Sequence, residues 1–435
     1  MTGYNRGMPT RLNGLWRHPD FVRLWTGQTV SVFGSLTTRI ALPFTAVVYL
    51  DARPFQIALV TAADVVAGIC FGLFVGVWVD RIRRRPMMIA ADIGRAIIVV
   101  SVPAAAVFGT LHIEQLYAVA FLAGILTTFF DVAYQSYLPT LVSADELVEG
   151  NSKLAASASV AEFGAFGTAG WLVQLITAPG AMLVDAGSFV VSAVSIAMIR
   201  RPEPPPAPAS EREPMIAEAL DGVRAIYHDR TLRVIAASWV LLSLASGMMS
   251  AVFLLFTARE LGFSPGVLGL IFAVGGVTSF VGAVLADWSR RTFGVGGAMI
   301  LGLVMGAVGF VIMAGAPHAS ILGAAILIAQ QVISDPGWTV YEINQISLRQ
   351  AIAPEAMLGR VNAGVRFAGL VAMLVGTISA GAIADAIGAR PVILLAGAAV
   401  FAAAVVVLCS PVRRLRTAPE RTDDVVATPA PEPIA

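Results

Sequence analysis

The chain has 435 residues, of which 57% are hydrophobic and 13% are charged, and its formal net charge at pH 7 is +1. A soluble globular chain has about 25% charged residues, so this composition excludes a soluble domain and predicts an all-α protein that crosses a lipid bilayer many times. The balanced charge gives no indication of nucleic acid as a partner, and the two cysteines lie in separate apolar runs without disulfide or metal-ligand spacing.

Twelve apolar runs are long enough to span the bilayer, which takes about 20 residues of helix. The first six predicted spans are 24–50, 56–79, 87–109, 114–138, 154–177 and 180–199. The other six are 232–257, 265–287, 296–316, 319–343, 362–385 and 390–410. We therefore expect twelve transmembrane helices, and the first run is too long to be a cleavable signal peptide.

A polar stretch over residues 200–231 divides the chain into two halves of six spans each, 24–199 and 232–410. It opens with Arg-Arg-Pro-Glu-Pro-Pro-Pro-Ala-Pro, a composition that breaks a helix, and then has apolar residues at helical spacing. We expect a stiff cytoplasmic linker followed by a helix on the membrane surface. Residues 1–23 form a polar N-terminal segment, and the proline-rich residues 411–435 are predicted to be a disordered tail.

The stretch from Gly76 to Arg85 sets the orientation of the other loops. It reads Gly-Val-Trp-Val-Asp-Arg-Ile-Arg-Arg-Arg, so an apolar run ends in a cluster of arginines. Arginine is costly at the centre of a membrane helix and collects in cytoplasmic loops. Alternating the spans from this loop leaves only Arg53, Arg259 and Arg390 at outer ends. Both termini are therefore predicted to be cytoplasmic, in a multi-pass protein of the plasma (inner) membrane.

The two halves carry copies of one pattern in corresponding loops. The copies are Gly76, Asp80, Arg84 and Arg85 after the second span, and Gly282, Asp287, Arg290 and Arg291 after the eighth. Because each half has an even number of spans, the copies keep the same orientation, which indicates a parallel repeat. Parallel repeats occur in transporters whose two halves rock about a central site.

The stretch Gly76-x-x-x-Asp80-Arg81-x-x-Arg84-Arg85 resembles motif A of the major facilitator superfamily, in the loop where that family carries it. The resemblance implies the family's fold of two six-helix pseudo-repeats. It also implies that Asp80, Arg84 and Asp131 form a relay that latches the two halves at the cytoplasmic face while the outside is open. The alternative is that the arginines only anchor the topology.

Further stretches resemble one branch of the superfamily, which contains the enterobactin exporter and macrolide efflux proteins. They are Phe130-Asp131 to Leu138-Pro139, Val184 to Phe189, Asn344 to Gln350, and Gly359 to Ala363. This branch implies export of a small molecule. Two departures are present: Arg83 stands where motif A commonly has glycine, and the fifth span lacks the Gly-Pro pair of the antiporter motif, which weakens an inference of antiport.

Ionisable residues inside the predicted spans are candidates for substrate binding or proton coupling. Arg39 in the first span and Asp64 in the second lie roughly 22 to 24 Å from the cytoplasmic interface, at about 1.5 Å per residue. We expect them to form a pair, which is either structural or part of the cavity.

Other charges in the spans have different interpretations. Glu162 in the fifth span has no arginine at its depth on a neighbouring helix, so it is our first candidate for proton coupling, and a carboxylate solvated in the cavity is the alternative. Asp92, Arg95 and Asp185 are interpreted as mainly structural charges near helix ends, with Asp92 and Arg95 at the spacing of an ion pair on one helix.

The tenth span is interrupted by Asp335-Pro336, which disturbs the backbone hydrogen bonds of a helix. Gln330, Gln331, Tyr341 and Trp338 lie nearby. Amide and aromatic groups on a kinked helix suit a cavity for a large amphipathic substrate, although aromatic residues also form the usual belt at the membrane interface.

Enzymatic chemistry is not indicated. The four histidines are scattered over different loops, and the single lysine, Lys153, is not part of a P-loop, so a metal cluster, a catalytic triad and a P-loop ATPase are excluded. We predict a secondary transporter without a cofactor, monomeric, exporting a small amphipathic molecule such as a drug, macrolide or siderophore with protons as the coupling ion. An importer of a siderophore or metabolite and a non-transporting receptor remain as alternatives, whereas a lipid-modifying enzyme would need clustered catalytic residues.

Overall fold

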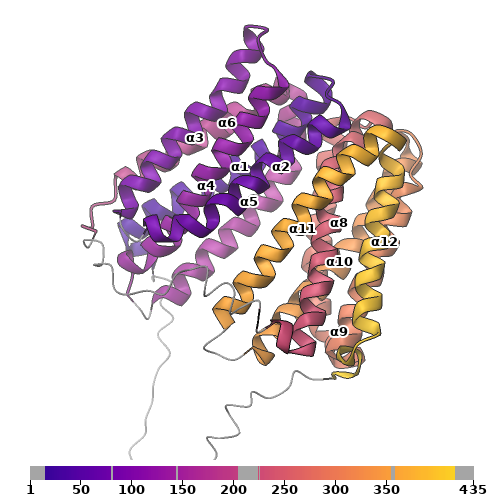
Figure 1. Ribbon diagram of the computed structural model, residues 1–435. Coiled ribbons are helices and arrows are strands. Elements are labelled where there is room, and N and C mark those ends of the chain that lie inside the picture. The colour runs from indigo at the N-terminus through magenta and orange to yellow at the C-terminus, as the bar shows by residue number, and fades with distance from the viewer. Residues whose placement is uncertain are drawn as a thin grey trace, which may run out of the picture.

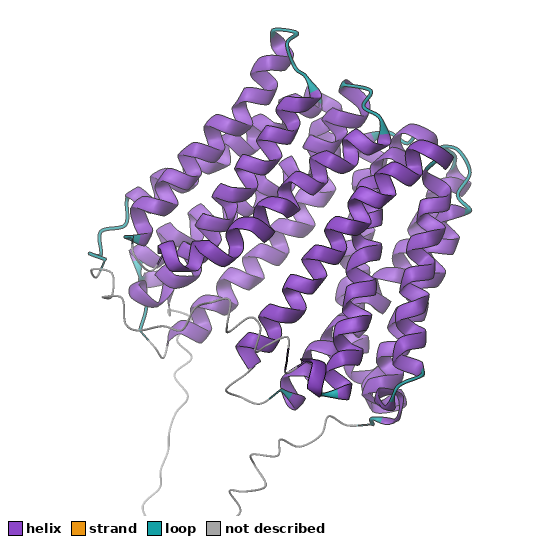
Figure 2. Cartoon of the chain, viewed as in Figure 1, coloured by secondary structure: helices purple, strands orange, loops and turns teal. Residues whose placement is uncertain are grey.

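The computed structural model describes residues 15–79, 82–143, 146–203, 224, 226–353 and 358–416. Within these residues the chain forms helices joined by short connections, and no strand is present (Figure 2). Each of the twelve predicted spans lies on a helix, and nine of the helices in the described ranges are long and apolar enough to cross a membrane. The prediction of an all-α polytopic membrane protein is therefore confirmed.

The N-terminal half consists of long helices that lie side by side (Figure 1). They are α1 (Pro19–Phe44), α2 (Pro54–Val79), α3 (Arg84–Val107), α4 (Ile113–Leu141), α5 (Leu147–Ile176) and α6 (Ala178–Ala197). A short 3-10 turn, η1 (Leu15–Arg17), precedes α1. Proline opens both α1 and α2, at a position where a helix needs no backbone N–H.

The C-terminal half begins where the Asp229 carboxylate accepts a hydrogen bond from the Leu232 N–H (2.7 Å) and so caps the next helix. Its helices are α8 (Arg230–Leu254), α9 (Pro265–Ala314), α10 (Ile321–Ile352), α11 (Leu358–Ile387) and α12 (Ala389–Leu408), followed by the short turn η6 (Pro411–Arg414).

Helix α9 includes both the eighth and the ninth predicted spans. The two helical arms are separated by a bend at Gly294, whose φ of 76° and ψ of 170° are not helical. A Cβ atom at this position would also lie 2.8 Å from the Cα of Arg416. Only glycine tolerates both the backbone conformation and the close approach. The two arms of α9 therefore correspond to the eighth and ninth spans.

The two halves repeat the same irregularities at corresponding places. Helix α1 continues into a π-helical segment, η2 (Thr45–Tyr49), and α8 continues into another, η4 (Leu255–Glu260). Helices α5 and α11 have 30 residues each and are followed by helices of 20 residues. The single connecting residues, Thr177 and Gly388, have positive φ angles of 68° and 85°. This correspondence confirms the predicted pair of six-helix pseudo-repeats.

Helix α1 begins and helix α12 ends at the same face of the bundle, at the bottom of Figure 1. We call it the terminal face, and the opposite one the far face. The halves meet through α2 against α11 and α5 against α9. A Cβ atom on Gly170 of α5 would lie 2.2 Å from the Pro265 carbonyl oxygen, and one on Gly381 of α11 would lie 2.4 Å from the Ala58 Cβ. Both contacts are near the far face, so the halves pack closely there.

Several predicted features lie outside the described residues. They are Asp80 and Arg81 of the motif A stretch, most of the 200–231 linker with its expected surface helix, the start of the N-terminal segment and the tail beyond Arg416.

Candidate functional site

A pocket of about 240 Å³ lies in the C-terminal half between α8, α10 and α11. It is lined by Trp239, Leu242, Ser243, Ser246, Trp338, Arg366, Gly369, Leu370 and Met373. The two indole rings supply apolar surface, the serine hydroxyls can form hydrogen bonds and Arg366 adds a positive charge. Apolar walls with a few polar groups are typical of sites for small molecules.

The charge of Arg366 interacts with the N-terminal half. Arg366 acts electrostatically on Asp131 of α4, and both side chains are exposed. A charged side chain at membrane depth is stable when it faces water or protein rather than lipid. A positive charge of the pocket therefore lies within electrostatic range of a negative charge on α4 of the other half.

Arg39 of α1 and Asp64 of α2 are exposed side chains that interact electrostatically. They do not form a direct ion pair among the contacts of the described residues. A Cβ atom on Gly124 of α4 would lie 2.7 Å from the Asp64 Oδ1 atom, so the carboxylate packs against a position that has no side chain. The ion pair expected between Arg39 and Asp64 is therefore not formed in this conformation, and their role remains a prediction.

The polar residues of α10 considered as candidates do not line the pocket. Gln330 and Gln331 are buried, and Thr278 of α9 donates a hydrogen bond to the Asp335 Oδ2 atom (3.5 Å). Tyr341 is 0% exposed, and its hydroxyl lies 2.8 Å from the Ser238 hydroxyl. Of the residues considered on this helix, Trp338 is the one that lines the pocket.

The motif A stretch is held to the N-terminal half at the terminal face. The Glu203 carboxylate accepts hydrogen bonds from the backbone N–H groups of Arg84 (2.6 Å) and Arg85 (3.1 Å), at the start of α3. The Arg85 guanidinium donates to the carbonyl oxygens of Ile196 and Ala197 at the end of α6. The described electrostatic partners of Asp131 are Arg95 and Arg366, so a contact between Asp131 and Arg84 is not formed in this conformation.

Two other predicted residues lie on helices of the N-terminal half. Gly76 lies in the last turns of α2, and Glu162 lies on α5 with its side chain outside the described part of the chain. Their predicted roles remain predictions.

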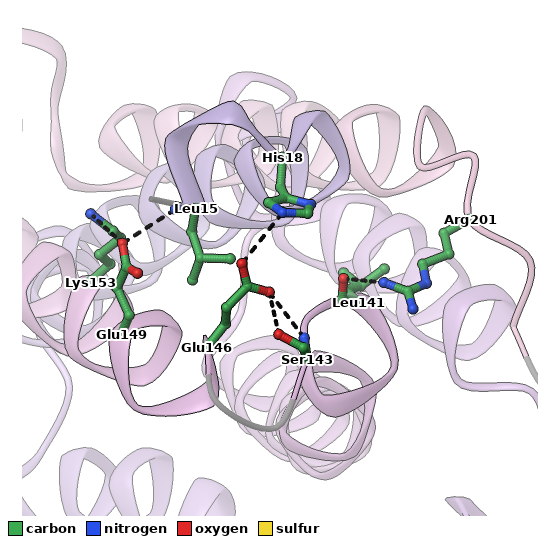
Figure 3. Close-up of polar contacts among 8 residues, drawn as sticks. All are labelled: Leu15, His18, Leu141, Ser143, Glu146, Glu149, Lys153 and Arg201. Atoms are coloured by element: carbon green, nitrogen blue, oxygen red, sulfur yellow. Dashed lines mark hydrogen bonds and ion pairs between the residues drawn. The ribbon is translucent and has the colours of Figure 1, made fainter. Parts of the chain in front are cut away.

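Further polar contacts tie the start of the chain to α5 at the terminal face (Figure 3). The Glu149 carboxylate accepts a hydrogen bond from the Leu15 N–H (3.2 Å) and pairs with Lys153 (3.4 Å). The Glu146 carboxylate lies 3.5 Å from His18 Nε2 and accepts a hydrogen bond from the Ser143 hydroxyl (2.6 Å). All these residues belong to the N-terminal half, so the contacts stiffen one half rather than joining the two.

Two sets of polar contacts between described residues join the halves at the far face. Arg259 of η4 pairs with the Asp51 carboxylate and donates a hydrogen bond to the Ala52 carbonyl oxygen (2.8 Å). The Gln174 side-chain oxygen of α5 accepts a hydrogen bond from the Gly266 N–H of α9 (3.1 Å). These contacts join the ends of helices that belong to different halves.

A buried charged cluster in the N-terminal half was missed by the sequence interpretation. Asp92 and Arg95 form the expected ion pair on α3, but they are 0% and 3% exposed and therefore not interfacial. Asp185 of α6 is 1% exposed and is acted on by Arg95. The rings of Phe130 and Phe189 enclose the Arg95 guanidinium, at 4.5 Å and 4.2 Å from their centroids. The signal available in the sequence was that these charges and rings all lie inside apolar runs.

Comparisons with known proteins agree with this architecture. The family model described as "Major Facilitator Superfamily" matches residues 24–376. The multidrug efflux pump Tap of Mycolicibacterium fortuitum is 26% identical over 88% of this chain and 96% of its own length. Macrolide efflux protein A of Streptococcus pyogenes is 22% identical over 91% of this chain and 96% of its own. The crystal structure of a bacterial homologue of the iron transporter ferroportin in an inward-facing state covers 90% of this chain and 98% of that one, with a TM-score of 0.74 at 15% identity.

Proposed function

We propose that this chain, which belongs to the Major Facilitator Superfamily, is an efflux transporter that exports a small amphipathic molecule across the plasma membrane in exchange for protons. Membership of the family makes the chain a multi-pass membrane transporter rather than an enzyme. The direction of transport, the substrate class, the coupling ion and the monomeric state are parts of the proposal. The efflux pumps among the relatives support export.

The observation that carries the proposal is the pocket between α8, α10 and α11. Trp239 and Trp338 offer flat apolar surfaces to a ring system or a macrocycle, and Arg366 offers a positive charge to a hydrogen-bond acceptor or an anionic group. The pocket is therefore suited to a molecule that is apolar over most of its surface and polar at one end.

The closure of the halves at the far face supports alternating access. With both termini in the cytoplasm, as the loop arginines predict, the terminal face is the cytoplasmic one and this conformation is inward-facing. A substrate then enters the pocket from the cytoplasm or the inner leaflet. Rocking of the half formed by residues 24–199 against the half formed by 232–410 opens the far face and releases the substrate outside.

The remaining predicted residues have roles within this cycle. Asp80, Arg84 and Asp131 latch the cytoplasmic face when the far face is open. Arg39 and Asp64 line the space between the halves, while Glu162 and Asp335 are candidates for proton coupling. In this scheme Gln330, Gln331 and Tyr341 shape α10 behind the pocket rather than contact the substrate.

The test is a deletion strain screened for susceptibility to, and accumulation of, macrolides, dyes and siderophores. Export predicts greater accumulation of at least one compound in the deletion strain and its ATP-independent, ΔpH-driven uptake into everted membrane vesicles. Lower accumulation in the deletion strain would instead identify an importer. An unchanged profile for every compound, with no binding to the purified protein, would favour a receptor.

A further inference from the structure

The N-terminal half contains more negative than positive groups at a place that water does not reach. Asp92, Arg95 and Asp185 are at most 3% exposed, and they lie inside α3 and α6 rather than at the helix ends. Arg95 carries a single positive charge, and Asp92 binds it directly in an ion pair. That pair is neutral, so the Asp185 carboxyl has no full opposite charge of its own.

The direct contacts of the Asp185 carboxyl are with neutral hydroxyl groups. The Ser188 hydroxyl lies 3.2 Å from Asp185 Oδ1, while its shorter contact is to the Asp185 backbone carbonyl oxygen at 2.7 Å. Helix α1 approaches closely at Gly34, where a Cβ atom would lie 2.8 Å from Asp185 Oδ1. The Thr38 hydroxyl of α1 is a second hydrogen-bond partner of the Asp185 side chain. An ionised carboxylate buried at membrane depth with only hydroxyl partners is strongly unfavourable, so the group is stable there when it holds a proton.

The charged groups facing Asp185 come from a small number of elements. Helix α3 contributes Arg95 and Asp92, which both act on it electrostatically. Helix α4 contributes Asp131, which is acted on by the same Arg95 and is exposed toward the space between the halves. Helix α1 contributes the neutral hydroxyl of Thr38, and the charged groups given as acting on Asp185 both come from α3. Arg95 thus lies between a buried acid and an exposed one.

We propose that Asp185, with Arg95 and Asp92, forms a proton-binding site in the N-terminal half that carries the coupling ion of transport, and this role rests on the proposed function. In the loaded state Asp185 is a neutral acid and the cluster of three groups has no net charge. On release, the O–H bond of Asp185 breaks, the proton passes to water on the side of Asp131, and the new carboxylate shares the Arg95 guanidinium with Asp92. The net charge of the cluster then changes from zero to −1.

The contacts of Arg95 explain how this change in charge can alter the packing of helices α4 and α6. The guanidinium lies between the rings of Phe130 on α4 and Phe189 on α6, and it also donates to the Thr127 hydroxyl (3.4 Å). Movement of Arg95 toward Asp185 therefore changes its contacts with α4 and α6 together. Release of the proton and movement of these helices are coupled through a single side chain.

The experiment is an infrared titration of the purified full-length protein, which requires no substrate. The wild-type spectrum at neutral pH should contain a carbonyl stretching band from a protonated carboxyl group, and Asp185→Asn should remove a component of it. Asp385→Asn, at an exposed position of α11, should leave that band unchanged. An identical band in wild type and Asp185→Asn would overturn the proposal.

A second variant covers the case in which Asp185→Asn does not fold. In protein made with ¹³C-labelled aspartate, Asp185→Glu should move one component of the band from the labelled to the unlabelled frequency, and no movement would overturn the site.

In proteoliposomes, uptake of radiolabelled erythromycin driven by ΔpH should be lost in Asp185→Asn while exchange at equal pH is kept; retained ΔpH-driven uptake would refute the coupling role. If wild type transports nothing under any gradient, the proposed function fails, and the infrared result still decides whether the proton site exists.

Discussion

At the scale of single residues, positions without side chains determine where the functional side chains lie. A Cβ atom on Gly369 would be 2.4 Å from Trp239 Nε1, so the indole ring can occupy the pocket only because α11 carries glycine there. Gly124 likewise leaves room for the Asp64 carboxylate, and Gly34 leaves room for the Asp185 carboxyl group. In each case a small residue on one helix admits a ring or a charge from another.

Trp239→Ala should weaken binding of the substrate identified by the accumulation screen. Loss of an aromatic contact costs on the order of 1.4 kcal/mol, which corresponds to about a tenfold rise in Kd. Binding to the purified protein, followed by quenching of tryptophan fluorescence, measures the change. Trp288→Ala is the matched control because Trp288 is 54% exposed and lies outside the pocket; equal effects of the two substitutions would argue against the pocket as the binding site.

At the scale of elements, the contacts that join the halves are made by helix ends. Helices α2 and α11 meet at the far face, and so do α5 and α9, each pair through glycine and backbone atoms. The closest of these contacts involve glycine positions and small or backbone atoms, and buried apolar residues of both halves, such as Ala58 and Ala384, belong to one packed cluster. The bend of α9, by contrast, packs closely against η6 and the residues that follow it.

Gly170→Leu should hold the far face open. Its Cβ atom would overlap the Pro265 carbonyl oxygen at 2.2 Å, so α5 cannot approach α9 and the population shifts toward conformations open at that face. Spin labels at Val48 and Ile321, both exposed at the far face, should report a longer distance by pulsed EPR. Gly187→Leu, where a Cβ atom meets nothing within 4 Å, should leave the distance unchanged; a shift in both proteins would contradict this account of closure.

Gly294→Ala should destabilise the protein. The residue adopts φ 76° and ψ 170°, a region essentially restricted to glycine, and the cost of placing another residue there is about 1–3 kcal/mol. The measurement is the melting temperature of the purified protein. Gly68→Ala, at a helical position with no neighbour within 4 Å of the added Cβ, should not lower it, and equal melting temperatures for Gly294→Ala and wild type would count against the bend as described.

At the scale of the whole molecule, the two pseudo-repeats contain different candidate sites. The pocket lies in the C-terminal half, between α8, α10 and α11, and the buried charged cluster lies in the N-terminal half, between α3, α4 and α6. The two sites are linked by Asp131, which is acted on by Arg95 on one side and by Arg366 on the other. Rocking of the halves would change the distance between Asp131 and Arg366, which lie in different halves. The distance between Asp131 and Arg95 would not change in this way, because both residues lie in the N-terminal half.

Thiol labelling should show which side of the membrane each face occupies. Cys70 and Cys409 are exposed, so both are first replaced by serine. In that background, Ser264→Cys at the far face should react with a membrane-impermeant maleimide in intact cells. Ser243→Cys in the pocket should react in everted vesicles and stay unlabelled in cells. The reverse pattern would show that the terminal face is external.

The positions of the helices could be predicted from the sequence because membrane helices satisfy their backbone hydrogen bonds within one segment. An apolar run of sufficient length is therefore enough to identify a span, and each predicted run lies on a helix. The doubled motif was likewise visible as a pattern, and the fold shows the pseudo-repeat in the paired π-helical segments and in the equal lengths of α5 and α11.

The sites depended on tertiary structure because helix rotation and depth are set by packing between segments distant in the sequence. Asp92 and Asp185 look like helix-end charges when each span is considered alone, and they become a cluster only when α3 and α6 pack around Arg95. Tyr341 and the glutamines share α10 with Trp338, yet Trp338 alone among them lines the pocket. The sequence by itself determined which segments cross the membrane, since that is a local property of composition; the tertiary structure decided which charges and rings meet, since that depends on the faces that the helices turn toward one another.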